Sequence, residues 1–132
     1  MEKVRVGVVG VGWIAQVVHL PMLQKLPEAE LVAICDRDKA RVRLVAEKFG
    51  IKRTYTDLSA MLETEDLAAV IICTSTDAHR DTAIVSLKAG KHVLVEKPIA
   101  RTYAEAAAIV EAGREAKRLV MVGITTASGR TR

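Results

Sequence analysis

Short apolar runs alternate with segments of helical periodicity along the whole chain. The runs are rich in Val and Ile and do not alternate strictly between apolar and polar residues. That pattern is typical of strands buried on both faces of a parallel sheet. The predicted strands are Val4–Val9, Leu31–Cys35, Arg53–Tyr55, Ala69–Cys73, His92–Val95 and Leu119–Val122.

The segments between these runs predict helices with recognisable ends. The first helix follows a glycine-rich turn, and Pro21 should break or kink it. Asp38 is expected to cap a helix that runs to Phe49 and stops at Gly50, and Asp57 to cap a short helix over Leu58–Leu62. A further helix is expected from Asp77 or a neighbouring threonine to Gly90. The last helix is expected from a capping box at Thr102–Glu105 to about Lys117. In the last helix, Ala106, Ile109, Val110, Gly113 and Ala116 form one apolar face.

Strands that alternate with helices predict an α/β fold, a doubly wound Rossmann sheet of six parallel strands in the order 3-2-1-4-5-6. Residues 1–123 would form this single domain. Residues 124–132 are polar and without period, and we expect them to be disordered or ordered only by a neighbour.

Composition narrows the possible functions. The net charge of +4 is mild, and the basic residues are scattered, which favours a solvated surface over nucleic-acid binding. No apolar run is long enough to cross a membrane, and the N-terminus does not resemble a signal peptide. Cys35 and Cys73 fall on strands separated by the first strand, so we expect reduced thiols and a cytoplasmic protein. The His and Cys residues lack the spacing of metal ligands.

The turn after the first strand predicts a dinucleotide site. Gly10 permits the tight turn, Gly12 allows a pyrophosphate to approach the backbone, and Ala15 lets the helix pack near the strand. Trp13 and Ile14 lie inside the same turn. The helix N-terminus behind them suits a diphosphate.

Asp36 stands at the end of the second predicted strand, 21 positions after Ala15. A carboxylate at this place typically accepts hydrogen bonds from the adenosine ribose of NAD. Arg37 follows and could pair with a 2′-phosphate or stack on adenine, so NADP remains an alternative. The carboxylate would repel that phosphate, which favours NAD.

Two further segments end strands at the same sheet edge. Thr74, Ser75 and Thr76 follow the fourth strand and could contact the nicotinamide ribose or phosphates, with His79 as a further pocket contact. The run Glu96–Pro98 follows the fifth strand. Its Lys97 could hold a substrate hydroxyl, stabilise an alkoxide or transfer a proton, whereas a surface lysine is the structural alternative. We interpret His19 and His92 as structural residues.

These residues together resemble the N-terminal half of the Gfo/Idh/MocA family, the relatives of glucose–fructose oxidoreductase and inositol dehydrogenase. The similarity runs from Val4 to Gly123. It rests on the glycine turn, His19-Leu20-Pro21, Cys35-Asp36, Tyr55-x-Asp57-Leu58, Thr74-x-Thr76-x-x-His79 and the highly specific run from Ala89 to Pro98.

The resemblance implies NAD(P)-dependent hydride transfer between nicotinamide C4 and a sugar, cyclitol or related hydroxyl compound. It assigns the catalytic lysine to Lys97 and cofactor contacts to the Thr74–His79 loop, Glu96, Lys97 and Pro98. It also implies a cis peptide before Pro98 and a homo-oligomer.

The sequence departs from the family in one respect. Family members continue into a second α/β domain that carries an Asp-x-x-x-His pair, and this sequence stops at Arg132. It is therefore interpreted as a fragment, a truncated product or a single-domain relative. Three functions stay open: an oxidoreductase that is incomplete as this chain alone, a dinucleotide-binding module without catalysis, and a remnant that self-associates.

Overall fold

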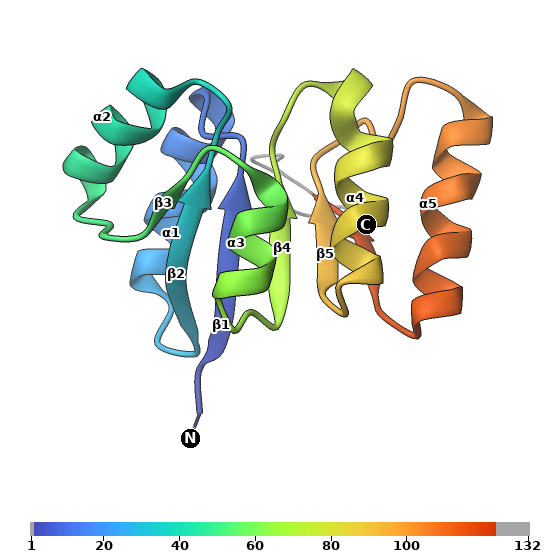
Figure 1. The fold of residues 1–132 in the computed structure, drawn as a ribbon, viewed down its shortest axis with the longest axis horizontal. Coiled ribbons are helices and arrows are strands. Elements are labelled where there is room, and N and C mark those ends of the chain that lie inside the picture. The colour runs from blue at the N-terminus through green and yellow to red at the C-terminus, as the bar shows by residue number, and fades with distance from the viewer. Residues whose placement is uncertain (1, 124–132) are drawn as a thin grey trace.

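All the strands form one parallel sheet in the order β3-β2-β1-β4-β5-β6 in the computed structural model, which describes residues 2–123 (Figure 1). The predicted fold class and strand order are confirmed. The strands are β1 (Val4–Val9), β2 (Ala29–Cys35), β3 (Thr54–Tyr55), β4 (Ala69–Ile72), β5 (His92–Val95) and β6 (Val120–Val122). Their bounds differ from the predicted runs by two residues at most.

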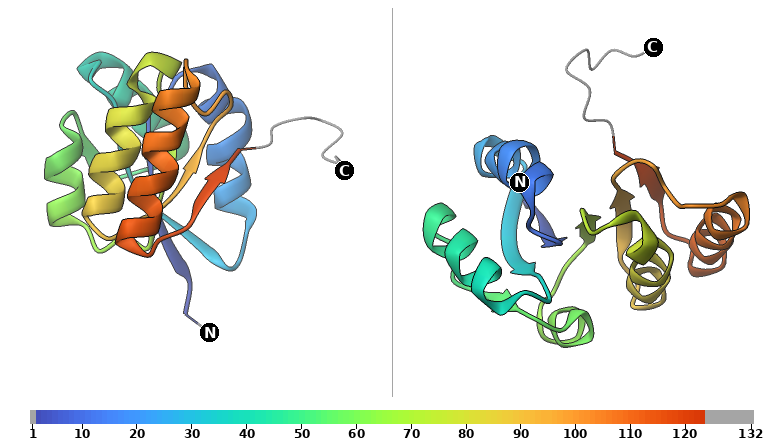
Figure 2. Two further views of the ribbon diagram at one scale, coloured as in Figure 1. Left: turned by 90° about the vertical axis from the view of Figure 1, so that its right-hand side faces the viewer. Right: turned by 90° about the horizontal axis from the view of Figure 1, so that it is seen from above.

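Helices cover both faces of the sheet (Figure 2). They are the π-helix η1 (Ala15–His19), α1 (Leu20–Lys25), α2 (Lys39–Phe49), α3 (Leu58–Thr64), the 3-10 turn η2 (Thr76–Ala78), α4 (His79–Lys88) and α5 (Tyr103–Ala116). Leu20 and Leu23 of α1 and Val42 and Val45 of α2 pack on one face. The opposite face is covered by α3, α4 and α5, whose Met61, Leu87 and Ile109 are fully buried.

The helical region after the glycine turn changes from a π-helix to an α-helix before Pro21 and continues without interruption to Lys25. Residues Ala15–His19 form the π-helix, in which the Leu20 N–H donates to the Ala15 carbonyl. Pro21 then lies in the first turn of α1, where a missing N–H costs no hydrogen bond. The π-turn brings His19 inward, and its side chain is buried.

The ends of α2 and the start of α3 follow the predicted caps. Asp38 and Asp57 accept hydrogen bonds from the N–H groups of Arg41 and Ala60, and Gly50 ends α2 in the left-handed region. Asp77 or a neighbouring threonine was expected to open the helix that ends at Gly90. The helical segment begins at Thr76 with the η2 turn, and α4 follows it with Ala78 as an N-cap that offers no side-chain bond.

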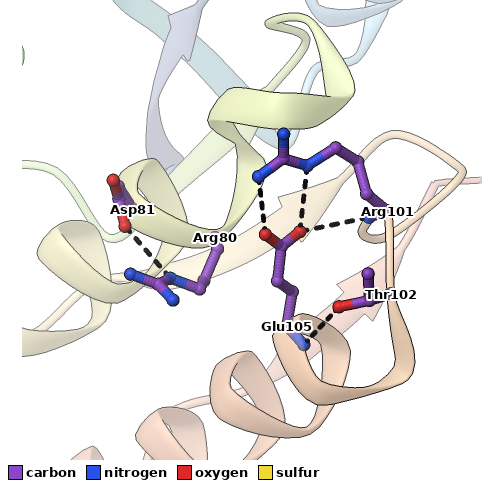
Figure 3. Close-up of polar contacts among 5 residues, drawn as sticks. All are labelled: Arg80, Asp81, Arg101, Thr102 and Glu105. Carbon is purple, nitrogen blue, oxygen red and sulfur yellow. Dashed lines mark hydrogen bonds and ion pairs between the residues drawn. The ribbon is translucent and has the colours of Figure 1, made fainter.

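The start of α5 differs in detail from the predicted capping box (Figure 3). Thr102 Oγ1 accepts from the Glu105 N–H at 3.1 Å, as expected. The Glu105 carboxylate accepts from the Arg101 backbone N–H at 3.3 Å and from its guanidinium at 2.7 Å, one residue before the usual box position. The predicted apolar face of α5 was wrong at Val110, which is 45% exposed.

Near β6, helices cover one face of the sheet more than the other. Val93 and Val95 of β5 are buried beneath α4 and α5. Met121 of β6 is 57% exposed, and within residues 2–123 both α1 and α2 pack against the other half of the sheet (Figure 2). The predicted tail 124–132 lies outside the described residues.

Candidate functional site

A cleft of about 790 Å³ opens where the carboxyl ends of β1 to β4 meet. Its volume is in the range of small-molecule sites. Parallel strands bring their following loops to one edge, so residues far apart in sequence share this cleft. The lining residues are Val9, Gly10, Gly12, Cys35, Asp36, Arg37, Arg41, Thr56, Asp57, Leu58, Cys73, Thr74, Ser75, Asp77, Ala78, Asp81 and Thr82.

The two glycines of the turn are required for different reasons. Gly10 has a φ of +86°, and a Cβ there would lie 2.7 Å from the backbone carbon of Cys73. Its conformation and its packing both exclude a side chain. A Cβ at Gly12 would meet no protein atom within 4 Å, although Gly12 lines the cleft. The protein itself therefore leaves the space at Gly12 open, and this space belongs to the cleft.

The three residues after Gly12 divide between solvent and core. Trp13 is 72% exposed, and Ala15 is fully buried at the start of η1. Ile14 is partly buried against the α1 side of the core. None of these three is among the residues that line the cleft, and their assignment to cofactor binding stays a prediction.

The Asp36 carboxylate is fixed at the floor of the cleft. Its Oδ2 accepts from the Val11 N–H at 2.8 Å, and its Oδ1 accepts from the Asp38 N–H at 2.8 Å. A carboxylate offers about four acceptor positions, so about two remain for ligand hydroxyls. Hydrogen bonds from the backbone thus orient Asp36 beside the glycine turn before any ligand arrives.

Positive charge gathers beside Asp36. Arg37 lines the cleft, and so does Arg41, whose Nη1 lies 3.6 Å from Asp36 Oδ2. Arg41 was not predicted as a site residue. Its place one helical turn after Asp38 was the available signal, because this spacing brings it back over the start of α2.

The loop after β4 forms the opposite wall. Thr74 and Ser75 line the cleft, whereas Thr76 does not. The pKa of the Asp77 carboxyl in η2 lies below its ordinary value, chiefly because the Ser75 side chain donates to it and also because Arg101 and Arg37 are near. Asp77 and Asp81 line the cleft and were missed as lining residues, since the sequence does not fix how η2 turns.

His79 joins the two loops beside the cleft and does not line it. Its side chain is buried at 1% exposure. Nε2 lies 3.0 Å from the Thr74 carbonyl oxygen, and Nδ1 lies 3.0 Å from the Pro98 carbonyl oxygen. The ring therefore connects the loop after β4 to the turn after β5.

The run Glu96–Pro98 lies past the end of β5 and outside the cleft lining. Lys97 is exposed, and the Lys97–Pro98 peptide is cis. Glu96 is 6% exposed, and the His19 Nε2–H donates to its carboxylate. The structure thus brings Lys97 to the same sheet edge as the cleft without making it a wall of the cleft.

The thiols are not positioned for chemistry. Burial, together with the smaller effect of neighbouring carboxylates, raises the pKa of both Cys35 and Cys73 to about 12. Both are free and buried. Within residues 2–123, no group of three His, Cys, Asp or Glu side chains is placed to hold a metal ion. The helices in this part of the chain are also too short or too polar for a membrane span.

Comparisons with known proteins give the same fold class and a family. The family model described as "Oxidoreductase family, NAD-binding Rossmann fold" matches residues 4–124. The 4-carboxy-2-hydroxymuconate-6-semialdehyde dehydrogenase of Sphingobium sp. is 41% identical over 107 residues, which cover 81% of this chain and 34% of that protein. The myo-inositol 2-dehydrogenase of Thermotoga maritima is 34% identical over 119 residues, which cover 90% and 35%.

A solved structure shows the same fold. The WlbA dehydrogenase from Bordetella pertussis, in complex with NADH and UDP-GlcNAcA, superposes with a TM-score of 0.88 at 32% identity. The alignment covers 92% of this chain and 37% of that one. The chain spans about a third of the length of the proteins that it matches. On this match and on the motifs from the glycine turn to Pro98, the chain belongs to the Gfo/Idh/MocA family of oxidoreductases with an NAD-binding Rossmann fold.

Proposed function

We propose that this chain binds NAD(H) in the cleft and supplies the cofactor half of a dehydrogenase acting on a sugar, cyclitol or related hydroxyl compound. The observation that carries the proposal is the pairing of Gly12 with Asp36. At Gly12 the backbone is open to the cleft, and beside it the Asp36 carboxylate is held with free acceptor positions. In dinucleotide-binding folds the pyrophosphate approaches such a glycine, and the ribose hydroxyls donate to such a carboxylate.

Different residues of the cleft would contact different parts of the cofactor and the substrate. The glycine turn admits the pyrophosphate, and Asp36 accepts from the ribose hydroxyls. Thr74 and Ser75 offer hydroxyl groups on the opposite wall. When bound, the nicotinamide would exchange a hydride with the substrate carbon. The Lys97 ammonium, with three donors and no acceptor, would hold the substrate hydroxyl and stabilise negative charge on its oxygen.

NAD is the preferred cofactor, and NADP is the alternative. The Asp36 carboxylate repels a 2′-phosphate, whereas Arg37 and Arg41 beside it would attract one. Parallel titrations with NADH and NADPH decide between them. Tighter binding of NADPH would contradict the preference. Cytoplasmic location and assembly into a homo-oligomer are further parts of this proposal, and size-exclusion chromatography tests the second.

A second candidate is a dinucleotide-binding module without catalysis. It is supported by Lys97, which is solvent-exposed and outside the cleft lining. Hydride transfer is favoured where water is excluded from the reacting groups. The test is NADH production from NAD across a panel of polyols and sugars. Turnover that Lys97→Ala abolishes supports the enzyme, and binding without turnover supports the module.

A further inference from the structure

Two buried ionisable side chains meet directly behind the turn that carries Lys97. Glu96 is 6% exposed and His19 is 3% exposed. Successive strand residues point to opposite faces, so Glu96 shares a face with Leu94, which packs against the α1 side of the core. The carboxylate thereby points toward η1, where the His19 Nε2–H donates to it.

The pair is not fully satisfied by hydrogen bonds. His19 Nδ1 is the buried side-chain nitrogen or oxygen that lacks a hydrogen-bond partner within residues 2–123. Burying a polar atom without a partner is unfavourable. A buried ion pair is also weak evidence for stability, because apolar residues of similar size often serve as well. Packing alone therefore does not explain why a histidine and a glutamate stand here.

The position of the pair links the glycine turn to Lys97. His19 is the last residue of η1, the helix that follows the turn, and Glu96 is the peptide neighbour of Lys97. Gly123, directly after β6, lies close to the carboxylate, because a Cβ added there would lie 3.2 Å from Glu96 Oε2. Cys73 is also near, since the Glu96 charge contributes to its raised pKa.

The segment that carries Lys97 is also contacted after the lysine. His79 reaches the carbonyl oxygens of Pro98 and Ile99, which follow Lys97. Buried histidines thus contact both the residue before Lys97 and the two residues after it. Lys97 itself is exposed. The exposed Lys97 amine therefore belongs to a segment, Glu96–Ile99, whose two ends are both contacted by buried histidines.

We propose that His19 is a positioning residue for Lys97. Through its buried contact with the Glu96 carboxylate, it fixes the peptide that places the Lys97 amine relative to the glycine turn. This inference rests on the proposed function, because it gives a purpose to the placement of Lys97. It assigns no contact of His19 with cofactor or substrate.

The test is NMR of the full chain after reductive methylation of its lysines with ¹³C-formaldehyde. Lys97→Arg identifies the Lys97 signal. His19→Leu removes the donor, and we expect the Lys97 signal to move while those of Lys48 and Lys88, on other helices, stay in place. His19→Gln retains a donor at a similar reach, and we expect it to restore the wild-type position.

His92→Leu is the matched control, because His92 is a partly buried histidine at the opposite end of β5. It should leave the Lys97 signal unchanged. An unmoved Lys97 signal in folded His19→Leu overturns the proposal. So does an equal shift of the Lys48 and Lys88 signals, which would indicate a general structural role.

His19→Leu could fail to fold because it leaves the Glu96 charge buried alone. The double variant His19→Leu/Glu96→Leu removes that charge, and we expect it to fold with a displaced Lys97 signal. Failure of both variants to fold overturns the proposal, since the pair would then serve folding itself. Titration of the wild-type sample with NADH tests the proposed function separately. A displaced Lys97 signal without NADH binding would leave this inference supported and the proposed function contradicted.

Discussion

At the carboxyl edge of the sheet, the loops after β1, β2 and β4 enclose a cleft, whereas the segments after β5 and β6 leave the predicted catalytic lysine exposed. On the side of β1, β2 and β4, the cleft has a floor at Asp36 and two opposite walls, all from described residues. On the side of β5 and β6, Lys97 is exposed and Met121 is 57% exposed. In the proposed function, the pyrophosphate and the adenosine ribose of the cofactor contact the first side, whereas hydride transfer also needs the second. We therefore expect binding and turnover to be separable, with binding by this chain and little or no turnover.

The largest expected effect is on the stability of the cleft side. Gly10→Ala should lower the free energy of unfolding by about 3 kcal/mol, since a Cβ there meets backbone at 2.7 Å in a left-handed conformation. Gly50→Ala is the control, because Gly50 has a φ of +70° but no atom within 4 Å of its Cβ position. It should cost about 1 kcal/mol. Urea denaturation measures both, and equal losses would contradict the close approach.

The next effect separates binding from stability. Gly12→Val should weaken NADH binding by about tenfold to a hundredfold, because the side chain would occupy space that the protein leaves empty. Its unfolding free energy should stay within about 0.5 kcal/mol of wild type. Fluorescence titration and urea denaturation provide the two numbers. Unchanged affinity would argue that the pyrophosphate lies elsewhere.

A smaller effect is expected at the floor of the cleft. Asp36→Asn keeps one acceptor oxygen and loses the charge, so NADH affinity should fall about tenfold. Asp38→Asn is the matched control, because Asp38 caps α2 and Asn caps helices equally well. The same titration should show no change for it. Similar losses in both variants would mean that general charge, rather than the ribose contact, is being measured.

The smallest effect concerns how the free energy of unfolding depends on pH through the hydrogen bond between Tyr55 and Glu65. The Tyr55 hydroxyl donates to the buried Glu65 carboxylate at 2.5 Å, and the Arg53 guanidinium lies 2.8 Å away. The Tyr55 hydrogen bond is the main reason why the pKa of Glu65 lies below its ordinary value. A lowered carboxyl pKa stabilises the fold above the unfolded pKa of about 4.3, and this stabilisation is lost as pH falls through the folded pKa.

Tyr55→Phe should therefore cost about 1–2 kcal/mol at neutral pH and less in acid. Tyr103→Phe is the control, since Tyr103 is 88% exposed and should show no effect at either pH. Urea denaturation at neutral pH and at about pH 3 makes the comparison. A loss that grows toward acid would show that the Tyr55 bond stabilises the protonated carboxyl instead.

Sequence reasoning predicted the features that depend on local spacing. The strand order, the glycine turn and the caps at Asp38 and Asp57 follow from residues that lie close together or from the rules of parallel sheets. One local detail was wrong. Val110 is exposed, because the face of α5 that packs on the core lies on the side of Ala112.

Contacts between distant residues could not be predicted from the sequence. His19 and Glu96 are 77 positions apart, and His19 ends a π-helix that the sequence did not predict. His79 was expected to contact the cofactor, and in the structure its ring nitrogens lie within 3.2 Å of three carbonyl oxygens of the two loops. Its role toward the cofactor stays a prediction. Tertiary packing determines these positions, and a single sequence contains little information about which distant residues will contact each other.

The most direct test of the comparison is a titration with NADH followed by the fluorescence of Trp13. Trp13 is the only tryptophan of the chain and is exposed next to the glycine turn, so a dinucleotide there should quench its emission. The account predicts saturable quenching by NADH, weakened in Gly12→Val and accompanied by no turnover of polyols or sugars. The absence of any saturable change at millimolar NADH would contradict it.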